Sequence, residues 1–316
     1  TRRSSDLIIL TGALLLMLPA ASRDGLATSF PDALFTATSA SCVTGLVIAD
    51  TFSKWTMFGQ CIILAMIQIG GLGFMTIGVF FAIILRRKIG LWMRGTLQES
   101  VNILQIGGIV RLAKKIMLGT LLFEGVGAAL LTLRFQEQMG WGKAVYYGIF
   151  HSISAFCNAG FDLMGKDAPY TSFTGYYDDP LVNIVIMALI IIGGIGFFVW
   201  NDVSTHRHHI SRYRLHTKIV LVTTAILVIG GAALLYLFES QNTLDGMSTQ
   251  GKVLSSLFGS VTARTAGFNT VDTAALTDNS KMLTIFLMFI GGSPGSTAGG
   301  IKTTTFVVLL VYVSAN

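Results

Sequence analysis

Long apolar runs are the feature that most restricts how this chain can fold. A helix that crosses a lipid bilayer needs about 20 consecutive apolar residues. Several runs approach or exceed that length, at residues 60–85, 116–135, 181–200, 219–238 and 282–313, and a shorter one covers residues 7–21. Only 12% of the residues are charged, whereas a soluble domain carries about a quarter. The sequence therefore predicts an all-α integral membrane protein.

The first apolar run has two interpretations. Arg2 and Arg3 precede it, a pattern that is also typical of a signal peptide. The run ends near Pro19 and leads directly into an element that recurs later in the chain. We therefore interpret residues 7–21 as the first membrane span.

Charged residues alternate in sign between the segments that join the apolar runs, although the formal net charge is +6. Basic residues fill two segments: Arg86, Arg87, Lys88, Arg94, Arg111, Lys114 and Lys115, then Arg207, Arg212, Arg214 and Lys218. Acidic residues fill the others: Asp24, Asp50, Asp162, Asp167, Asp178, Asp179, Glu239, Asp245, Asp272 and Asp278. By the positive-inside rule the basic segments are cytoplasmic and the acidic ones external. The charge pattern thus indicates a multi-pass membrane topology and not a nucleic-acid-binding protein.

Two short motifs occur three times along the chain. IGGLGF at 69–74 returns as IGGIGF at 192–197 and, altered, as IGGSPG at 290–295. Upstream of these lie TSASCVTGL at 38–46, SISAFCNAGF at 152–161 and GSVTARTAGF at 259–268. Each of these upstream motifs overlaps the end of a semi-apolar stretch; the three stretches lie at about residues 31–40, 144–156 and 253–261. The sequence therefore predicts tandem repeats of span, short helix, glycine turn and span, with repeat 1 at 1–89, repeat 2 at 90–212 and repeat 3 at 213–316.

The predicted short helices cannot cross a bilayer, and their lengths suit re-entrant segments. Non-helical backbone at membrane depth is tolerated only where it is buried in protein or lines a water-filled cavity. Three such turns brought to one place would surround a shared axial cavity. Ordinary helix-capping turns are the alternative, but their threefold recurrence before glycine-interrupted spans favours a central pore.

The turns CVTG, CNAG and RTAG contain no acidic ring and no metal-ligand cluster. Their glycines permit backbone conformations that turn successive carbonyl groups toward one axis. Rings of carbonyl oxygens replace the hydration shell of a potassium ion in channel filters, and the C-terminal ends of helices carry partial negative charge. The sequence predicts a carbonyl site for a monovalent cation, with no cofactor and no other metal in this chain.

These motifs resemble those of the Trk/Ktr/HKT potassium transporter superfamily over essentially the whole chain. The sequence segments SCVTGL, FCNAGF, TARTAGFN and STAGGIKTTTF are most similar to those of its bacterial Ktr-type pore subunits. The resemblance implies a filter built on one glycine per repeat and the carbonyl-bearing residues before it: Val43, Thr44 and Gly45; Asn158, Ala159 and Gly160; Thr265, Ala266 and Gly267. It also implies a structural role for Arg264, which would hold the third turn by interacting with acidic residues on the external side.

The resemblance carries further implications for function and assembly. It implies potassium uptake across a bacterial plasma membrane, with Na⁺ as a candidate modulator. It implies a homodimer in the lipid bilayer and a cytosolic RCK-type regulatory subunit that binds ATP or ADP. The superfamily has four repeats, so we expect a fourth to complete the filter.

GGSPGSTAGGIKTTTF at 291–306 interrupts the last apolar run. A phosphate-binding loop needs lysine where Ile301 stands, between a strand and a helix, so a nucleotide site is disfavoured. The stretch is instead an expanded third IGG motif, placed by the repeat below the filter. The resemblance implies an intramembrane gating loop at 291–305 that includes Gly291, Gly292, Ser293, Gly295, Ser296, Thr297, Gly299, Gly300 and Lys302. Lys302 would either repel cations or hold the loop through carbonyl groups.

Other polar residues have alternative interpretations. His206, His208 and His209 are candidate metal ligands, but their arginine neighbours and the lack of a partner ligand favour a solvated basic loop. Glu124 lies mid-span and is either a packing hydrogen-bond partner or a group near the conduction path. Gln68 either lines the inner cavity or bonds across helices.

The favoured function is therefore uptake of potassium or another monovalent cation. The alternative is a secondary transporter of another small solute, built on broken helices around a midplane site. Inverted repeats would favour that alternative, whereas the repeats here share one orientation. No catalytic set recurs at one membrane depth, so the sequence does not predict an enzyme.

Overall fold

The structure, a computed structural model, describes residues 2–73, 109–166 and 168–315. Its α-helices are α1 (Arg2–Leu16), α2 (Phe30–Ser41), α3 (Thr51–Lys54), α4 (Met57–Leu72), α7 (Ile109–Met139), α8 (Trp141–Phe156), α9 (Pro180–Gly194), α10 (Phe197–His206), α11 (Leu215–Glu239), α12 (Thr249–Ala263), α13 (Asp278–Phe289) and α14 (Thr303–Ala315). Over the same ranges, β structure is limited to isolated bridges between Ser22 and Trp55 and between Ile290 and Ile301. The predicted all-α fold is confirmed for these residues.

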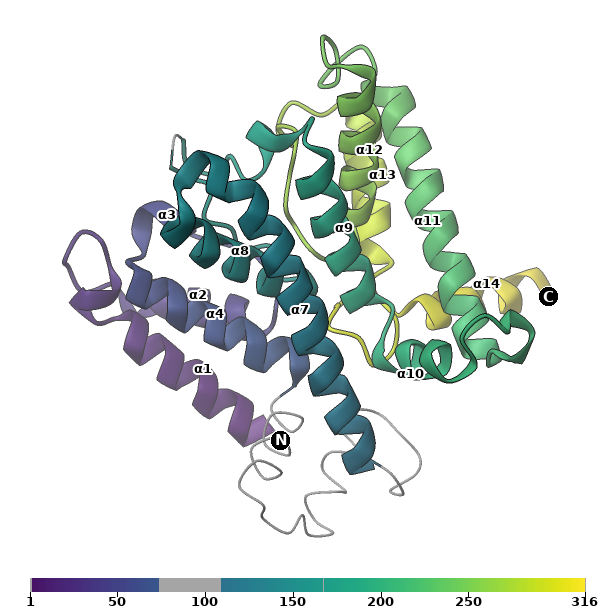
Figure 1. Cartoon of the computed structure of the whole chain (residues 1–316), viewed down its shortest axis with the longest axis horizontal. Helices are drawn as coiled ribbons and strands as arrows, with labels where there is room; N and C mark the ends of the chain where they lie inside the picture. The colour runs from purple at the N-terminus through teal and green to yellow at the C-terminus, as the bar shows by residue number, and fades with distance from the viewer. Residues whose placement is uncertain (1, 74–108, 167, 316) are drawn as a thin grey trace.

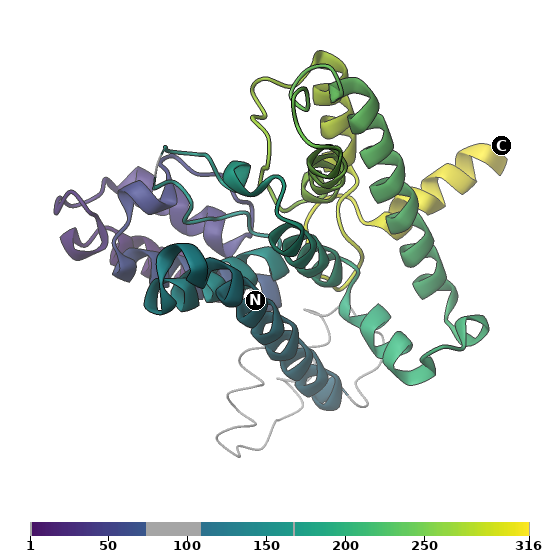
Figure 2. The same ribbon diagram turned by 45° about the horizontal axis from the view of Figure 1, so that its top comes forward.

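The helices form two groups joined through α7, α8 and α9 (Figure 1). At one end α1, α2 and α4 contact one another, and at the other end α11, α12 and α13 do so. Helix α9 lies between the groups and contacts α7, α8 and α12. Helix α14 contacts α11 and extends outward to the C-terminus (Figure 2). The arrangement brings the ends of α2, α8 and α12 toward the middle of the molecule.

Two described helices, within Val110–Met139 and Leu215–Glu239, are long and apolar enough to cross a membrane. By length and composition they agree with the spans predicted at 116–135 and 219–238. The run at 60–85 is only partly described, since it passes beyond Gly73 into residues that the structure does not describe. Shorter apolar helices lie at Ser5–Leu16, Met57–Leu72 and Thr303–Ala315.

The run predicted at 181–200 is present as a bent pair of helices and not as one straight helix. It consists of α9 and α10, which are bent by 97° relative to each other. At the bend Gly196 has φ +93°, and the N–H of Phe197 donates to the carbonyl of Gly295 at 2.8 Å. A distant segment thus satisfies the backbone group that the broken helix leaves without a partner.

The three predicted short helices are present as α2, α8 and α12. The N-terminal residues of α2 and α12 are held by serine caps, because Ser29 accepts from the N–H of Asp32 and Ser248 from the N–H of Gly251. The Ser248 cap places the start of α12 at Thr249, earlier than the predicted residue 253. Capping of this kind satisfies N–H groups that have no partner inside the helix.

The first glycine of the IGG motif allows a span to touch the end of a short helix. A Cβ atom built on Gly70 would lie 1.9 Å from the carbonyl oxygen of Ser41, and one built on Gly193 would lie 2.0 Å from that of Phe156. No side chain fits at these distances, which explains the first glycine in the first two copies of the motif. The third motif differs, because the Cβ of residue 291 would meet the carbonyl oxygen of Gly299 at 1.9 Å.

We expect Gly193→Ala to destabilise the protein by about 1–3 kcal/mol, the usual cost of forcing extra atoms into a packed core. Gly194→Ala is the matched control, because its Cβ would have no neighbour closer than Ala298 Cβ at 3.9 Å and its gain in helix propensity is similar. Thermal unfolding of the purified protein in detergent measures the effect. Equal unfolding temperatures for the two variants would contradict this explanation of the motif.

Candidate functional site: three converging turns and an adjoining loop

The turns after α2, α8 and α12 share an unusual backbone conformation. Val43, Asn158 and Thr265 have φ of 55°, 59° and 101°, and two residues later Gly45, Gly160 and Gly267 have φ of 76°, 71° and 94°. Positive φ is uncommon for residues other than glycine and costs energy. Positive φ therefore recurs at the same two positions of each turn.

The three turns meet at one place. A Cβ built on Gly45 would lie 2.5 Å from the carbonyl oxygen of Ala159 and 3.5 Å from that of Ala266. One built on Gly160 would lie 2.0 Å from the Ala266 carbonyl oxygen and 3.3 Å from the Cα of Gly267. Residues from separate repeats thus bring backbone carbonyl groups together, at a spot where neither Gly45 nor Gly160 has room for a side chain.

The N–H groups of the turns are bound to their own short helices. The N–H of Thr44 donates to Ser39 O and that of Ala159 to Ser154 O, both at 2.8 Å. In the third turn the N–H of Ala266 donates to Thr262 O at 3.0 Å. Because these donors are already engaged, it is the carbonyl side of each turn that remains available for a cation.

Hydroxyl groups of the short helices donate hydrogen bonds to the carbonyl of the residue after the turn glycine. Ser154 Oγ donates to the Phe161 carbonyl at 2.7 Å, and Thr262 Oγ1 donates to the Phe268 carbonyl at 2.8 Å. These bonds hold both sides of the second and third turns to one helix. The sequence motifs contain both hydroxyl residues, but their spacing alone did not indicate this role.

His151 supports the second turn and was not recognised in the sequence. It is fully buried in α8, and its Nε2 accepts from the N–H of Leu163 at 3.0 Å. Its Nδ1 therefore carries the proton and donates to the Tyr147 carbonyl at 2.7 Å. An ionisable residue inside a short apolar helix, shortly before the turn, was the available indication in the sequence.

The predicted gating loop closes on itself between α13 and α14. The N–H of Gly291 donates to Ile301 O at 3.0 Å, and that of Gly292 donates to Gly299 O at 3.1 Å. Lys302 Nζ donates to the Ala298 carbonyl at 2.7 Å. Of the two roles considered for Lys302, the structure provides the carbonyl contact that holds the loop.

The loop also binds the second turn and the bend between α9 and α10. Thr297 Oγ1 donates to the Phe156 carbonyl at 2.9 Å and accepts from Asn158 Nδ2 at 3.0 Å. The N–H of Ser293 donates to the Gly194 carbonyl at 2.9 Å. The loop between α13 and α14 therefore lies against the end of α8.

Arg264 does not have the partner that the sequence suggested. It was expected to brace the third turn against external acids, but its Nη2 donates to the Gly291 carbonyl at 3.2 Å, in a buried contact. The salt bridges of the described residues do not include it. A carbonyl 27 positions along the chain replaces the expected carboxylate, so Arg264 joins the third turn to the loop.

The acids that follow the turns have other partners. Asp50 Oδ1 accepts from the N–H of Tyr170 at 3.1 Å, and Asp162 Oδ1 accepts from the N–H of Met164 at 2.9 Å. Burial, together with the nearby Asp50 carboxylate, raises the pKa of Asp162 to about 6. These carboxyl groups are held by backbone donors in the segments after the first and second turns.

Comparison with known proteins identifies the family. Residues 7–314 match TrkH, described as a cation transport protein. The chain belongs to the TrkH family. It is 43% identical over 312 residues to the potassium/sodium uptake protein NtpJ of Enterococcus hirae, covering 98% of this chain and 67% of that protein. It is 43% identical over 311 residues to the Ktr system potassium uptake protein B of Bacillus subtilis, covering 98% of this chain and 68% of that protein.

A solved structure supports the same fold. The crystal structure of the potassium transporter TrkH from Vibrio parahaemolyticus matches with a TM-score of 0.73 and 20% identity, over 100% of this chain and 62% of that one. The chain thus spans about two thirds of the length of these relatives. The family comprises membrane ion transporters and not enzymes, and the resemblance drawn from the motifs is confirmed.

In this TrkH-family chain, Gln68 and Glu124 connect α4 and α7. Gln68 Nε2 donates to Glu124 Oε2 at 3.0 Å, and the Cys157 thiol donates to Gln68 Oε1 at 3.7 Å. Glu124 is 6% exposed, and its Oε1 has no hydrogen-bond partner among the described residues. Of the alternatives left open by the sequence, both residues make the cross-helix bond, and the bond extends to the residue before Asn158.

The histidine segment 205–210 also has a structural role. His206 Nδ1 lies 3.0 Å from Asp202 Oδ1, and the N–H of Arg214 donates to Asp202 Oδ2 at 2.9 Å. Over the part of the chain that the structure describes, no group of three His, Cys, Asp or Glu side chains is placed to hold a metal ion. The basic residues at 86–94 lie outside the described residues, as does Asp167.

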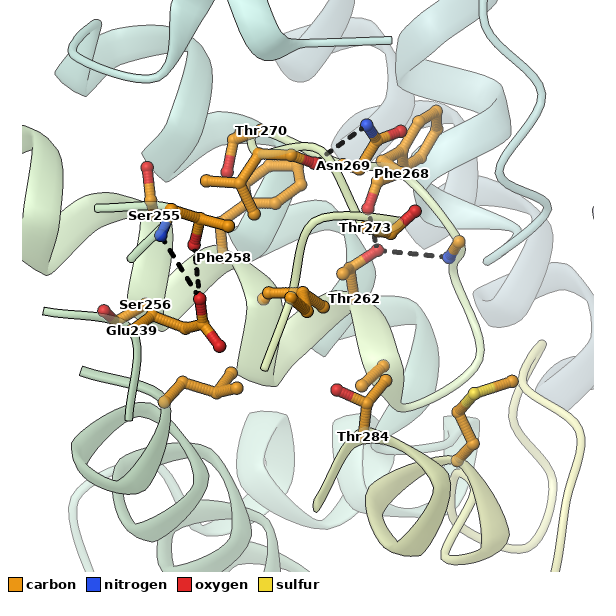
Figure 3. Close-up of a pocket in the computed structure, with 18 of the residues that line it drawn as sticks. Glu239, Ser255, Ser256, Phe258, Thr262, Phe268, Asn269, Thr270, Thr273 and Thr284 are labelled. Atoms are coloured by element: carbon orange, nitrogen blue, oxygen red, sulfur yellow. Dashed lines mark hydrogen bonds between the residues drawn. The ribbon is translucent and has the colours of Figure 1, made fainter. Parts of the chain in front are cut away.

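A cavity of about 350 Å³ lies beside the first and third turns. Thr44, Thr265 and Gly267 contribute to its lining, together with residues of α11, α12 and α13. Figure 3 shows Thr262 and Phe268 on the side of the third turn and Glu239 among the other lining residues. Glu239 is itself engaged, accepting from Thr277 Oγ1 at 2.7 Å and Thr243 Oγ1 at 2.8 Å.

We expect Glu124→Ala to lower stability by about 1–3 kcal/mol, because the partly buried amide of Gln68 would lose its acceptor. Glu124→Gln is the control, since its amide oxygen can still accept that bond. Thermal unfolding in detergent compares the two. If the glutamine variant were as unstable as the alanine variant, the Gln68 bond would not be the source of the effect.

Proposed function

We propose that this chain forms the ion-conducting part of a bacterial uptake system of the Ktr type, which carries potassium through a carbonyl-lined filter. The supporting observation is the convergence of the Gly45, Gly160 and Gly267 turns on one place, with carbonyl groups of one turn against the glycines of another. The relatives named for potassium or potassium/sodium uptake support the same cargo. The plasma membrane of a bacterium is the proposed location.

The proposed mechanism needs only backbone chemistry at the filter. Carbonyl groups of Val43, Thr44, Asn158, Ala159, Thr265 and Ala266 would replace water around a dehydrated potassium ion. The partially negative C-terminal ends of α2, α8 and α12 would add attraction for a cation. An inward membrane potential would then drive the ion toward the cytoplasm.

We propose that each turn supplies one quadrant of the filter, in repeats 1–89, 90–212 and 213–316. A fourth quadrant would lie between the first and third turns. The cavity there, lined by Thr44 and Gly267, supports this position. A homodimer in the bilayer and a cytosolic RCK-type subunit that binds ATP or ADP remain predictions from the family resemblance, and membership of the Ktr system by the relatives supports partner subunits.

We propose that residues 291–305 gate the pore. The hydrogen bonds of Thr297 to Phe156 and Asn158, at the end of α8 and in the second turn, support this role. Lys302 and Arg264 bind loop carbonyls, which would stabilise the closed form. The shared orientation of the repeats favours a pore over the alternative, a secondary transporter of another solute.

Expression of the full-length gene is expected to restore growth of a potassium-uptake-deficient bacterium at low potassium. Gly160→Ala should abolish this rescue, because the new Cβ would overlap the Ala266 carbonyl oxygen at 2.0 Å. Gly246→Ala is the matched control, since Gly246 has a similar φ of +73° but no neighbour within 4 Å. Failed rescue by the wild type, or full rescue by Gly160→Ala, would refute the filter proposal.

Deletion of residues 296–299 should leave the pore leaky, because it removes Thr297 and the Ala298 carbonyl that binds Lys302. Rubidium uptake into vesicles, measured with and without nucleotide-loaded regulatory subunit, is expected to become fast and independent of that subunit. Uptake that stays regulated as in the wild type would show that the loop is only a kink in the span.

A further inference from the structure

We propose that Thr297 couples the loop to the filter, so that the position of the loop sets ion discrimination as well as flux. Thr297 is a positioning residue in this proposal, which rests on the proposed potassium filter and gate. A loop that merely obstructed the pore would change how fast ions pass and leave their relative rates unaltered. The contacts of Thr297 favour the coupled arrangement.

Thr297 is inserted between three elements. Its side-chain oxygen donates to the Phe156 carbonyl at 2.9 Å and accepts from Asn158 Nδ2 at 3.0 Å. Its N–H donates to the Gly193 carbonyl at 3.3 Å. The residue is 7% exposed, so these bonds form without competition from bulk water. One side chain of the loop thus binds the C-terminal end of α8 and the first strained residue of the second turn.

Asn158 extends this contact into the filter. It is 1% exposed and has φ +59°. Its Oδ1 accepts from Thr265 Oγ1 at 3.5 Å, at the limit of a hydrogen bond. Because Thr265 is the first strained residue of the third turn, the Asn158 amide contacts the loop on one side and the third turn on the other.

Movement of the loop would leave buried polar groups without partners. If Thr297 withdrew, Asn158 Nδ2 would keep only long contacts, at 3.3 Å to Phe156 O and 3.4 Å to Ile190 O. A buried polar group that loses its partner is costly, so the Asn158 side chain and the strained backbone that carries it are expected to rearrange. Selectivity depends on where the filter carbonyls lie and how strongly they bind, so discrimination should change when the loop moves.

The loop contains a matched hydroxyl pair that does not contact the filter. Ser293 Oγ and Thr303 Oγ1 lie 3.0 Å apart, and both residues are fully buried. This bond joins the loop to the start of α14. Thr303→Val therefore removes a buried hydroxyl group of the loop and its one bond while leaving the Asn158 contact in place, whereas Thr297→Val removes the bonds to Phe156 and Asn158.

The test compares Thr297→Val, Thr297→Ser and Thr303→Val in the full-length protein with its regulatory subunit. Uptake of potassium and of sodium into proteoliposomes is measured separately, and the ratio of the two rates is the readout. We expect Thr297→Val to lower the potassium-to-sodium ratio about fivefold, the effect of losing roughly 1 kcal/mol. Thr297→Ser should keep the wild-type ratio, and Thr303→Val should change only the absolute rates.

Three results would overturn the proposal: an unchanged ratio in Thr297→Val, an equal fall in Thr303→Val, or a fall in Thr297→Ser that matches the valine variant. If Thr297→Val does not reach the membrane in normal amounts, Thr297→Ala makes the same comparison without added bulk. Failure of the proposed function would be distinct, because the wild-type protein itself would then show no potassium-selective uptake.

Discussion

Backbone N–H and C=O groups in non-helical segments at membrane depth need hydrogen-bond partners. The rest of this structure depends on which groups serve as those partners. The turns after α2, α8 and α12 return their N–H groups to the helices that precede them. Their carbonyl groups are thereby left to face the neighbouring turns. Polar backbone that would be unfavourable in lipid becomes a cluster of oxygens, which in the proposed filter would bind a dehydrated cation.

Glycine makes this arrangement sterically possible in two kinds of contact, between a span and a short helix and between one turn and another. Gly70 and Gly193 let α4 and α9 touch the carbonyl groups at the ends of α2 and α8. Gly45 and Gly160 let one turn approach the carbonyl oxygens of another. A side chain at any of these positions would separate the turns, so the spans and the site are held together by the same close backbone contacts.

The adjoining loop is held by a different kind of interaction. Arg264 and Lys302 carry buried or half-buried positive charge, and each donates to a loop carbonyl, Gly291 O or Ala298 O. Carbonyl groups satisfy these cations where the sequence suggested acids for Arg264. Thr297 adds a neutral contact with Asn158. The loop is therefore bound to the second and third turns through separate residues.

The short helices and their turns could be predicted because each is a local feature that recurs. A semi-apolar stretch too short to cross a bilayer, followed by small residues and a glycine, predicts a short helix and a turn at each of its three occurrences. The bend between α9 and α10 could not be predicted in this way. It depends on Gly295, whose carbonyl accepts from Phe197 and which lies about a hundred residues further along the chain. The role of His151 was missed for a related reason, because its partner Leu163 lies beyond the turn.

The sequence by itself determined the membrane class, the order of spans and short helices, and the glycines that permit strained turns, because these follow from local length, polarity and backbone freedom. Only the tertiary structure decided which carbonyl groups meet, that Arg264 binds Gly291, and that Thr297 binds Asn158. Those contacts join residues that lie far apart in the sequence. Their distances are set by how whole helices pack against glycine, and local sequence patterns carry no information about that packing.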